Sequence, residues 1–146
     1  MSILAHSFGT YLTTKYVEGF ASEEYLPVRL ENVVFAGSIV NPEYDWNRWI
    51  PTKVGRVLNI VAEGDDAVKF MPNGDWKTVA GVDKICGKAA IEGFKNTSEN
   101  VTNRPIEILN HSNIFKDDFI NQILLPYLNA NGDMGNRDAT LKAIRG

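Results

Sequence analysis

A serine between small residues stands near the start of the chain, in the segment AHSFG over residues 5–9. A short apolar stretch over residues 2–5 leads into it, and the spacing of apolar residues predicts a helix over residues 10–20. A serine in a tight turn between a strand and a helix projects its Oγ above the sheet edge, as a nucleophile must. Such a turn crowds the residues two before and two after the serine, and both are small here. The segment therefore predicts a nucleophilic Ser7, with capping of the helix as the alternative role.

Carboxylate and imidazole groups, which together can activate a serine, follow predicted strands later in the chain. Asp65 and Asp66 follow one strand, and His111 follows the next. A serine hydroxyl needs an adjacent base, an imidazole takes and returns the proton, and a carboxylate orients the imidazole. We therefore predict a triad of Ser7, Asp65 and His111. Asp66 is the alternative acid, because a slip of one residue in the loop exchanges the two carboxylates.

Each of these groups also has a plain structural alternative. The two aspartates fit a solvated turn, and His111 fits a packed histidine that is hydrogen-bonded to the backbone. The N–H of Phe8, just after the serine, is the expected oxyanion donor. The remaining candidates are predicted to line a pocket, with packing as the alternative: His6, Tyr44, Trp46 and Trp49.

The elements that must position these residues alternate between strands and helices. Continuous apolar runs rich in β-branched residues predict buried strands, and amphipathic spacing predicts helices. The strands are expected at 2–5, 32–38, 57–62 and 106–109, and the helices at 10–20 and 115–128. This order indicates an α/β protein with a parallel sheet of about four strands flanked by helices. Ligands bind at the carboxyl ends of the strands in such sheets, where the candidate residues fall.

The other segments are predicted to be irregular. Residues 67–103 contain several glycines and no long periodic pattern, which indicates a loop with short helical pieces. Residues 129–146 are predicted to be a linker followed by a short helix. The length of 146 residues is typical of one domain, so residues 1–146 are expected to form a single domain.

Composition excludes several functional classes. The chain has 15 basic and 18 acidic residues and no basic run, so no nucleic-acid partner is expected. No apolar stretch has the length of a membrane span, and residues 1–20 lack the apolar core of a secretory signal, which favours a cytoplasmic protein. Cys86 is the single cysteine and is expected to be buried, and no metal-ligand cluster is visible. Neither a metal nor a cofactor is predicted.

Over residues 2–128 the chain resembles the C-terminal half of an α/β-hydrolase-fold protein. The resemblance lies in three segments: the elbow AHSFG, the turn VAEGDDAV over residues 61–68 and the segment NHSNIF over residues 110–115. The family often has an aspartate followed three residues later by valine, and a Gly-His-Ser-Asp segment at its histidine. The resemblance implies a serine hydrolase that acts on a small ester, thioester or amide without a cofactor, with Ser7 as nucleophile, Asp65 as acid and His111 as base.

The same resemblance implies strands that are not predicted here. The family's sheet normally has eight strands, with the elbow after the fifth. Only the last four have counterparts, so the N-terminal half of the sheet, with the loop that supplies the second oxyanion donor, is expected to be missing and activity to be impaired. The exposed edge of the strand at residues 2–5 would then be covered by a second copy of the chain or by a complementing N-terminal half.

Two other functions compete with hydrolysis. A non-catalytic binding or interaction domain can retain the hydrolase shape, since a fold does not determine function. A phosphate-binding module that uses the helix after Gly9 is a weaker alternative, because the segment lacks the glycines and the lysine of a phosphate-binding loop.

Overall fold

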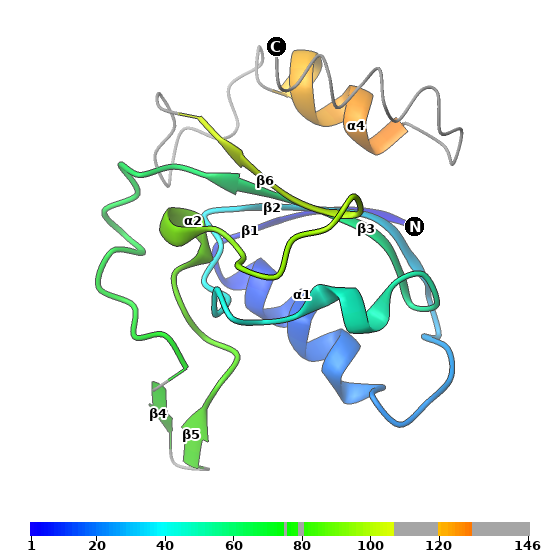
Figure 1. Cartoon of the computed structure of the whole chain (residues 1–146), viewed down its shortest axis with the longest axis horizontal. Coiled ribbons are helices and arrows are strands. Elements are labelled where there is room, and N and C mark those ends of the chain that lie inside the picture. Colours follow the sequence, from blue (N-terminus) through cyan, green and yellow to red (C-terminus); the bar gives the residue numbers. More distant parts are fainter. Residues whose placement is uncertain (75, 79–80, 107–119, 130–146) are drawn as a thin grey trace.

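A parallel sheet of four strands forms the centre of the protein, in the order β1-β2-β3-β6 (Figure 1). The computed structural model describes residues 1–74, 76–78, 81–106 and 120–129. The strands are β1 (Ser2–His6), β2 (Leu30–Ala36), β3 (Val54–Val61) and β6 (Val101–Pro105). This sheet confirms the α/β class that the alternating strand and helix patterns predicted.

The connections between the strands cover one face of the sheet, and the later helices cover the other (Figure 1). The first group comprises α1 (Phe8–Gly19), the 3₁₀ turn η1 (Trp46–Trp49) and α2 (Ala89–Glu92); the second comprises the π-helical turn η2 (Ile120–Leu124) and α4 (Leu125–Asn129). Each strand adds beside the previous one in the same direction. Because such crossovers are right-handed, successive connections fall on the same face.

Both faces of the sheet are buried. Val33 and Phe35 of β2 face the α1 side and pack in one core cluster, while Val34 and Ala36 face the α4 side and pack in a second. Successive side chains of a strand point to opposite faces, so a strand covered on both sides contains a nearly continuous apolar run. This burial explains why β2 and β3 were recognisable in the sequence. Cys86 is buried, as predicted.

A polar network fixes α4 to its face of the sheet. Asn32 of β2 donates hydrogen bonds to the carbonyl oxygen of Leu128 at 3.1 Å and to Oγ of Ser2 at 2.9 Å. Arg56 of β3, also buried, donates to the carbonyl oxygen of Tyr127 at 2.8 Å and lies over the ring of that tyrosine. These bonds satisfy carbonyls at the C-terminal end of the helix that the short α4 cannot satisfy itself.

The fourth strand of the sheet begins earlier in the chain than predicted. A strand was expected at residues 106–109, whereas β6 covers Val101–Pro105. β6 pairs with β3 and has no second strand partner in the described sheet, and its central residues Thr102, Asn103 and Arg104 are polar. An edge strand of this composition lacks the apolar run on which the prediction relied. The N–H of Ile106 still donates to the carbonyl oxygen of Val61 at 2.8 Å, and residues 107–109 lie outside the described residues.

The segment predicted as loop with helical pieces also contains strands. β4 (Trp76–Thr78) and β5 (Gly81–Asp83) pair as an antiparallel hairpin that stands apart from the main sheet (Figure 1). The helix predicted at residues 115–128 is described only from residue 120 onward, where η2 and α4 occupy it. Of the predicted linker and terminal helix, only Asn129 is described.

Candidate active site

Ser7 occupies the turn between β1 and α1 in a backbone conformation that side chains other than glycine rarely adopt. Its φ is 52° and its ψ is −121°, and among the described residues no other non-glycine residue has a positive φ. Such a conformation raises the free energy by about 1–3 kcal/mol and persists only where the surrounding structure enforces it. Here the N–H of Ser7 donates to the carbonyl oxygen of Ala36 at 3.1 Å, and its carbonyl oxygen accepts from the N–H of Thr10 at 3.0 Å and from Oγ1 of Thr10 at 2.7 Å. The turn is therefore held from both β2 and α1.

The alternative role of Ser7 as a helix cap is wrong. Ser7 stands at the N-cap position of α1, but its side chain makes no capping hydrogen bond. The hydroxyl therefore does not accept a hydrogen bond from the first N–H groups of α1, and the residue is half-buried. A strained serine whose side chain leaves the helix terminus uncapped is the arrangement that an exposed nucleophile requires.

The small residues on either side of Ser7 do face each other. A Cβ atom built on Gly9 would lie 3.9 Å from the Cβ of Ala5, which is an ordinary van der Waals contact. The crowding that the motif implied is therefore milder than expected, since an alanine fits at position 9.

We accordingly predict that Gly9→Ala leaves the protein as stable as before or up to about 1 kcal/mol more stable, because alanine favours the helix over glycine. Gly19→Ala is the matched control, since a Cβ at Gly19 of the same helix meets nothing within 4 Å. Urea unfolding of both variants measures the change. A loss of more than about 1 kcal/mol for Gly9→Ala relative to Gly19→Ala would show that the turn needs glycine.

Phe8 begins α1 and places its N–H next to the serine. The first N–H groups of a helix have no acceptor within the helix and carry its positive end. The Phe8 side chain is 58% exposed, and its ring stacks on the ring of Tyr11 with centroids 5.5 Å apart. The role of Phe8 as oxyanion donor stays a prediction.

The two candidate acids differ sharply in environment. Asp65 is 1% exposed, whereas Asp66 is exposed. Oδ1 of Asp65 accepts a hydrogen bond from the N–H of Val68 at 3.2 Å, and the N–H of Asp65 donates to the carbonyl oxygen of Ala62 at 3.0 Å. These two bonds close the turn after β3 through the backbone of Val68 and Ala62. A carboxylate is buried in a protein only at a cost unless polar partners compensate, so Asp65 is the carboxylate that the fold holds in place.

Ser7 and Asp65 both lie at the end of the sheet where the parallel strands finish, that is, at their carboxyl ends. β1 ends at His6 and β3 ends at Val61, and both are parallel to β2, which lies between them. Neighbouring strands are about 4.8 Å apart, so the two strand ends are separated by about 10 Å. β6 lies on the far side of β3 and leads toward residues 107–119. His111 lies outside the described residues, and the fold brings the strand that precedes it next to the strand that precedes Asp65.

The aromatic candidates that follow β2 are placed in the core. Tyr44, Trp46 and Trp49 are all buried in the cluster on the α1 side of the sheet. The indole N–H of Trp49 donates to the Tyr44 hydroxyl at 2.9 Å, and that hydroxyl donates to Oε1 of Glu18 at 2.6 Å. Glu18 is in the last turn of α1, about 16 Å along the helix from Ser7 at 1.5 Å per residue. The packing alternative therefore describes these three residues.

Burial and a neighbouring guanidinium determine the electrostatic environment of this aromatic cluster. Burial raises the pKa of Tyr44 well above its usual range, so its hydroxyl stays protonated. The guanidinium of Arg48 lies over the rings of Tyr44 and Trp49, at 4.9 and 4.6 Å from their centroids. His6, the remaining pocket candidate, ends β1 and is half-buried on the face opposite Ala5, paired in register with Ala36.

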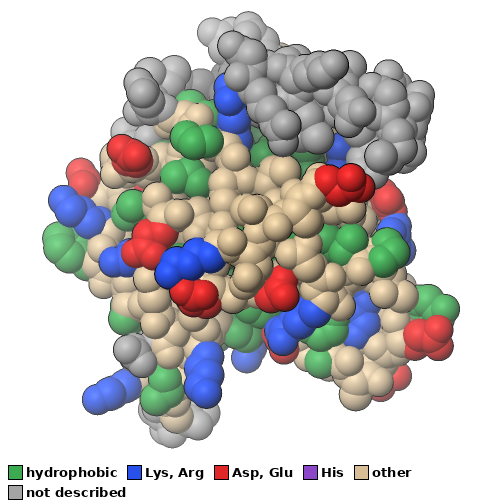
Figure 2. All heavy atoms as spheres, viewed as in Figure 1, with side chains coloured by type: hydrophobic (Ala, Val, Ile, Leu, Met, Phe, Trp, Pro, Cys, Tyr) green, Lys and Arg blue, Asp and Glu red, His purple; other side chains and the backbone are tan. Residues whose placement is uncertain are grey.

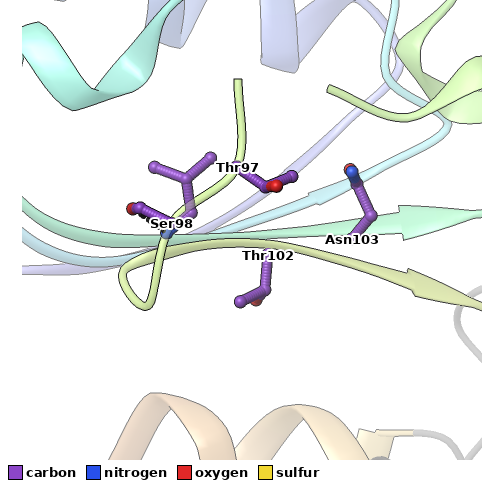
Figure 3. A pocket seen from close by; sticks show the side chains of 5 residues that line it. Thr97, Ser98, Thr102 and Asn103 are labelled. Atoms are coloured by element: carbon purple, nitrogen blue, oxygen red, sulfur yellow. Dashed lines mark hydrogen bonds between the residues drawn. The ribbon is translucent and has the colours of Figure 1, made fainter. Parts of the chain in front are cut away.

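A hollow of about 310 Å³ lies along the edge strand β6 and includes none of the candidate residues (Figure 3). Its lining comprises Thr97, Ser98, Val101, Thr102 and Asn103. The labelled side chains in Figure 3 belong to β6 and to the loop before it. The hollow is open to solvent and adds no titratable group that could take part in catalysis.

Metal chemistry adds no competing site in the described part of the chain. Figure 2 shows acidic and basic side chains interspersed on one face of the molecule. Within residues 1–74, 76–78, 81–106 and 120–129, no three His, Cys, Asp or Glu side chains are grouped as a metal site would require. None of the described helices has the length and apolar character needed to cross a membrane.

Comparison of the chain with protein-family models, with curated proteins and with solved structures finds no match.

One contact near Ser7 was not anticipated from the sequence. The hydroxyl of Tyr11, one turn into α1, donates a hydrogen bond to Oδ2 of Asp83 at the end of the β4–β5 hairpin. The two residues are 72 positions apart, and no periodic pattern marks either of them. Only the docking of the hairpin beside α1 reveals the pair.

Proposed function

We propose that the chain carries the hydrolytic site of an α/β-hydrolase-type serine hydrolase and acts on a small ester, thioester or amide. Ser7 is the nucleophile, Asp65 the acid and His111 the base of this site. The observation that carries the proposal is the conformation of Ser7, with φ 52° and ψ −121°, in the turn between a parallel strand and a helix that its side chain does not cap. A turn of this kind stores strain that helix capping does not require.

The reaction proceeds in two halves. His111 removes the hydroxyl proton as Oγ of Ser7 attacks the substrate carbonyl carbon, and the Phe8 N–H stabilises the oxyanion that forms. The oxyanion then collapses, the bond to the leaving group breaks and His111 returns the proton to that group. Water repeats the sequence on the acyl-serine, which releases the acid and restores Ser7. Asp65 holds the tautomer of His111 and stabilises the imidazolium, and no cofactor is required.

The topology supports these roles. The nucleophile follows β1 and the acid follows β3 at the carboxyl end of the parallel sheet, and β6, the described strand that precedes the base in the sequence, lies beside β3. The burial of Asp65 and the exposure of Asp66 favour Asp65 as the acid.

The site as proposed needs a second oxyanion donor and a neighbour for β1. In the described sheet β1 pairs only with β2, and a parallel edge strand is seldom left open. We propose that a second copy of the chain or a separate N-terminal half of the sheet pairs with this edge and supplies the donor.

A fluorophosphonate probe tests the proposal. We expect the folded chain, supplied alone or with an N-terminal half, to gain one probe mass on the peptide that contains Ser7, and the heat-unfolded chain to gain none. Size-exclusion chromatography of the labelled sample identifies the partner, because a labelled monomer would contradict pairing at β1. Absence of labelling in every sample, or labelling of another serine, would favour the non-catalytic binding domain.

A further inference from the structure

Tyr11 lies on the side of α1 that does not face the sheet, one turn after the candidate nucleophile. The buried positions of the helix are Thr10, Thr13, Thr14 and Val17. Tyr11 instead stacks on Phe8, with the planes of the two rings inclined by 20°. Side chains three positions apart are neighbours on a helix, so this stack fixes the orientation of Phe8 through Tyr11.

Asp83 is a rigid acceptor for the Tyr11 hydroxyl. One carboxylate oxygen, Oδ2, accepts from Tyr11, while Oδ1 accepts from the N–H groups of Ile85 at 2.8 Å and Cys86 at 3.2 Å. The backbone beyond Asp83 is in turn tied to the segment after β2, because the N–H of Asn41 donates to the carbonyl oxygen of Ile85 at 2.6 Å. The carboxylate of Asp83 is thus connected through the backbone to the segment that follows the carboxyl end of β2.

The protonation states of Tyr11 and Asp83 favour the hydrogen bond between them. The hydrogen bond to Asp83, followed by burial, raises the pKa of Tyr11 to about 12. Burial raises the pKa of Asp83, but the hydrogen bonds from Tyr11, Ile85 and Cys86 outweigh it and lower that pKa overall. Near neutral pH the phenol is therefore protonated and the carboxylate ionised, which is a strong hydrogen-bonding combination.

We propose that Tyr11 and Asp83 are positioning residues for the Ser7 site: the carboxylate holds the Tyr11 ring, the ring holds Phe8, and Phe8 presents the oxyanion-binding N–H. This inference rests on the proposed hydrolase function. It assigns the β4–β5 hairpin a role in catalysis without contact with the reacting atoms. Because the pair acts on the oxyanion donor, it affects the chemical step and leaves the initial binding of substrate unchanged.

The test uses two conservative variants and one matched control. Tyr11→Phe removes the hydroxyl and retains the ring, and Asp83→Asn removes the charge and retains the shape. Tyr16→Phe is the control, because its hydroxyl lies on the same helix and exchanges hydrogen bonds with the backbone of Val28, at 3.2 Å to the carbonyl oxygen and 3.0 Å from the N–H. Urea unfolding verifies that all three variants fold.

We expect the maximal rate of fluorophosphonate labelling to fall about tenfold to a hundredfold in Tyr11→Phe and in Asp83→Asn, since a small misplacement of a catalytic group has an effect of this size. The probe concentration at half-maximal rate should not change, and Tyr16→Phe should label within about twofold of the parent chain. The variant with both substitutions should be no slower than the slower single variant, as for two groups of one contact.

A second measurement does not depend on activity. Nuclear Overhauser contacts between the rings of Phe8 and Tyr11 should be strong in the parent chain and weak in Asp83→Asn. If the parent chain labels at Ser7 while both variants retain its rate and the ring contacts persist, the positioning role is overturned and the hydrolase proposal stands. If the parent chain does not label, the hydrolase proposal fails and the positioning role falls with it, whatever the ring contacts show.

Discussion

Replacing Asp65 by asparagine is expected to lower the turnover of an ester substrate by about four orders of magnitude, which is the effect of the same change in serine proteases. Asparagine retains an oxygen that can accept from the N–H of Val68, so the turn after β3 stays closed. Under the proposed mechanism, what is lost is the negative charge that fixes the tautomer of His111 and stabilises its protonated form. The maximal rate falls, and the substrate concentration at half-maximal rate changes little.

Asp66→Asn is the matched control for this substitution. Asp66 is adjacent, exposed and of the same type, so its charge is screened by solvent and the turnover should stay within about twofold. Steady-state hydrolysis of a chromogenic ester measures both variants in the oligomeric form that the parent chain adopts. The reverse order of effects would mean that Asp66 is the acid, and equal small effects would remove the carboxylate from the mechanism.

Replacing Ser7 by glycine is expected to abolish hydrolysis and, at the same time, to stabilise the fold relative to Ser7→Ala by about 1 kcal/mol. Alanine removes the hydroxyl but retains the Cβ that is strained at a φ of 52°. Glycine relieves about 1–3 kcal/mol of strain, and its greater freedom in the unfolded chain offsets about 0.5–1 kcal/mol of that gain. The pair of variants therefore separates the loss of the nucleophile from the release of backbone strain.

Labelling by the fluorophosphonate probe and urea unfolding are the two measurements. Both variants should show no labelling, and only Ser7→Gly should have the higher unfolding midpoint. If Ser7→Gly were the less stable of the two, the turn would not be strained, and the observation that carries the proposed function would lose its meaning. A matched comparison is available at Gly19→Ala in α1, where no positive φ is involved and the expected change has the opposite sense, with alanine the more stable.

How far the sequence predicts this structure depends on burial. The runs that became β2 and β3 are apolar at nearly every position because both of their faces are covered, and their positions were predicted to within three residues at each end. β6 lies at the edge of the described sheet and is polar at its centre, so the same rule did not recognise residues 101–105 as a strand. The hairpin of β4 and β5 contacts α1 through a hydrogen bond between residues 72 positions apart, which no local pattern reveals.

In the candidate site, too, some features were predictable from the local sequence and others depend on contacts formed in the fold. The turn at Ser7 was predictable because small residues, a strand and a helix coincide there, whereas its φ and ψ depend on the hydrogen bond that Ser7 donates to Ala36 and on those it accepts from Thr10. Asp65 and Asp66 are chemically identical, and only the folded structure distinguishes the buried Asp65 from the exposed Asp66. From the sequence, the aromatic residues after β2 could either line a pocket or pack in the core. The hydrogen bond from Tyr44 to Glu18, at the far end of α1, favours packing.

The arrangement of the connections also sets an order of folding. All crossovers between the four strands fall on the α1 face, so the helical cover that the structure describes over the opposite face, with Val34, Leu58 and Ile60, comes from residues 120–129. The contact from Asn32 to Leu128 spans 96 positions and closes a long loop. During synthesis on the ribosome, an apolar sheet surface therefore remains open to water, and to chaperones, until the segment that carries η2 and α4 emerges.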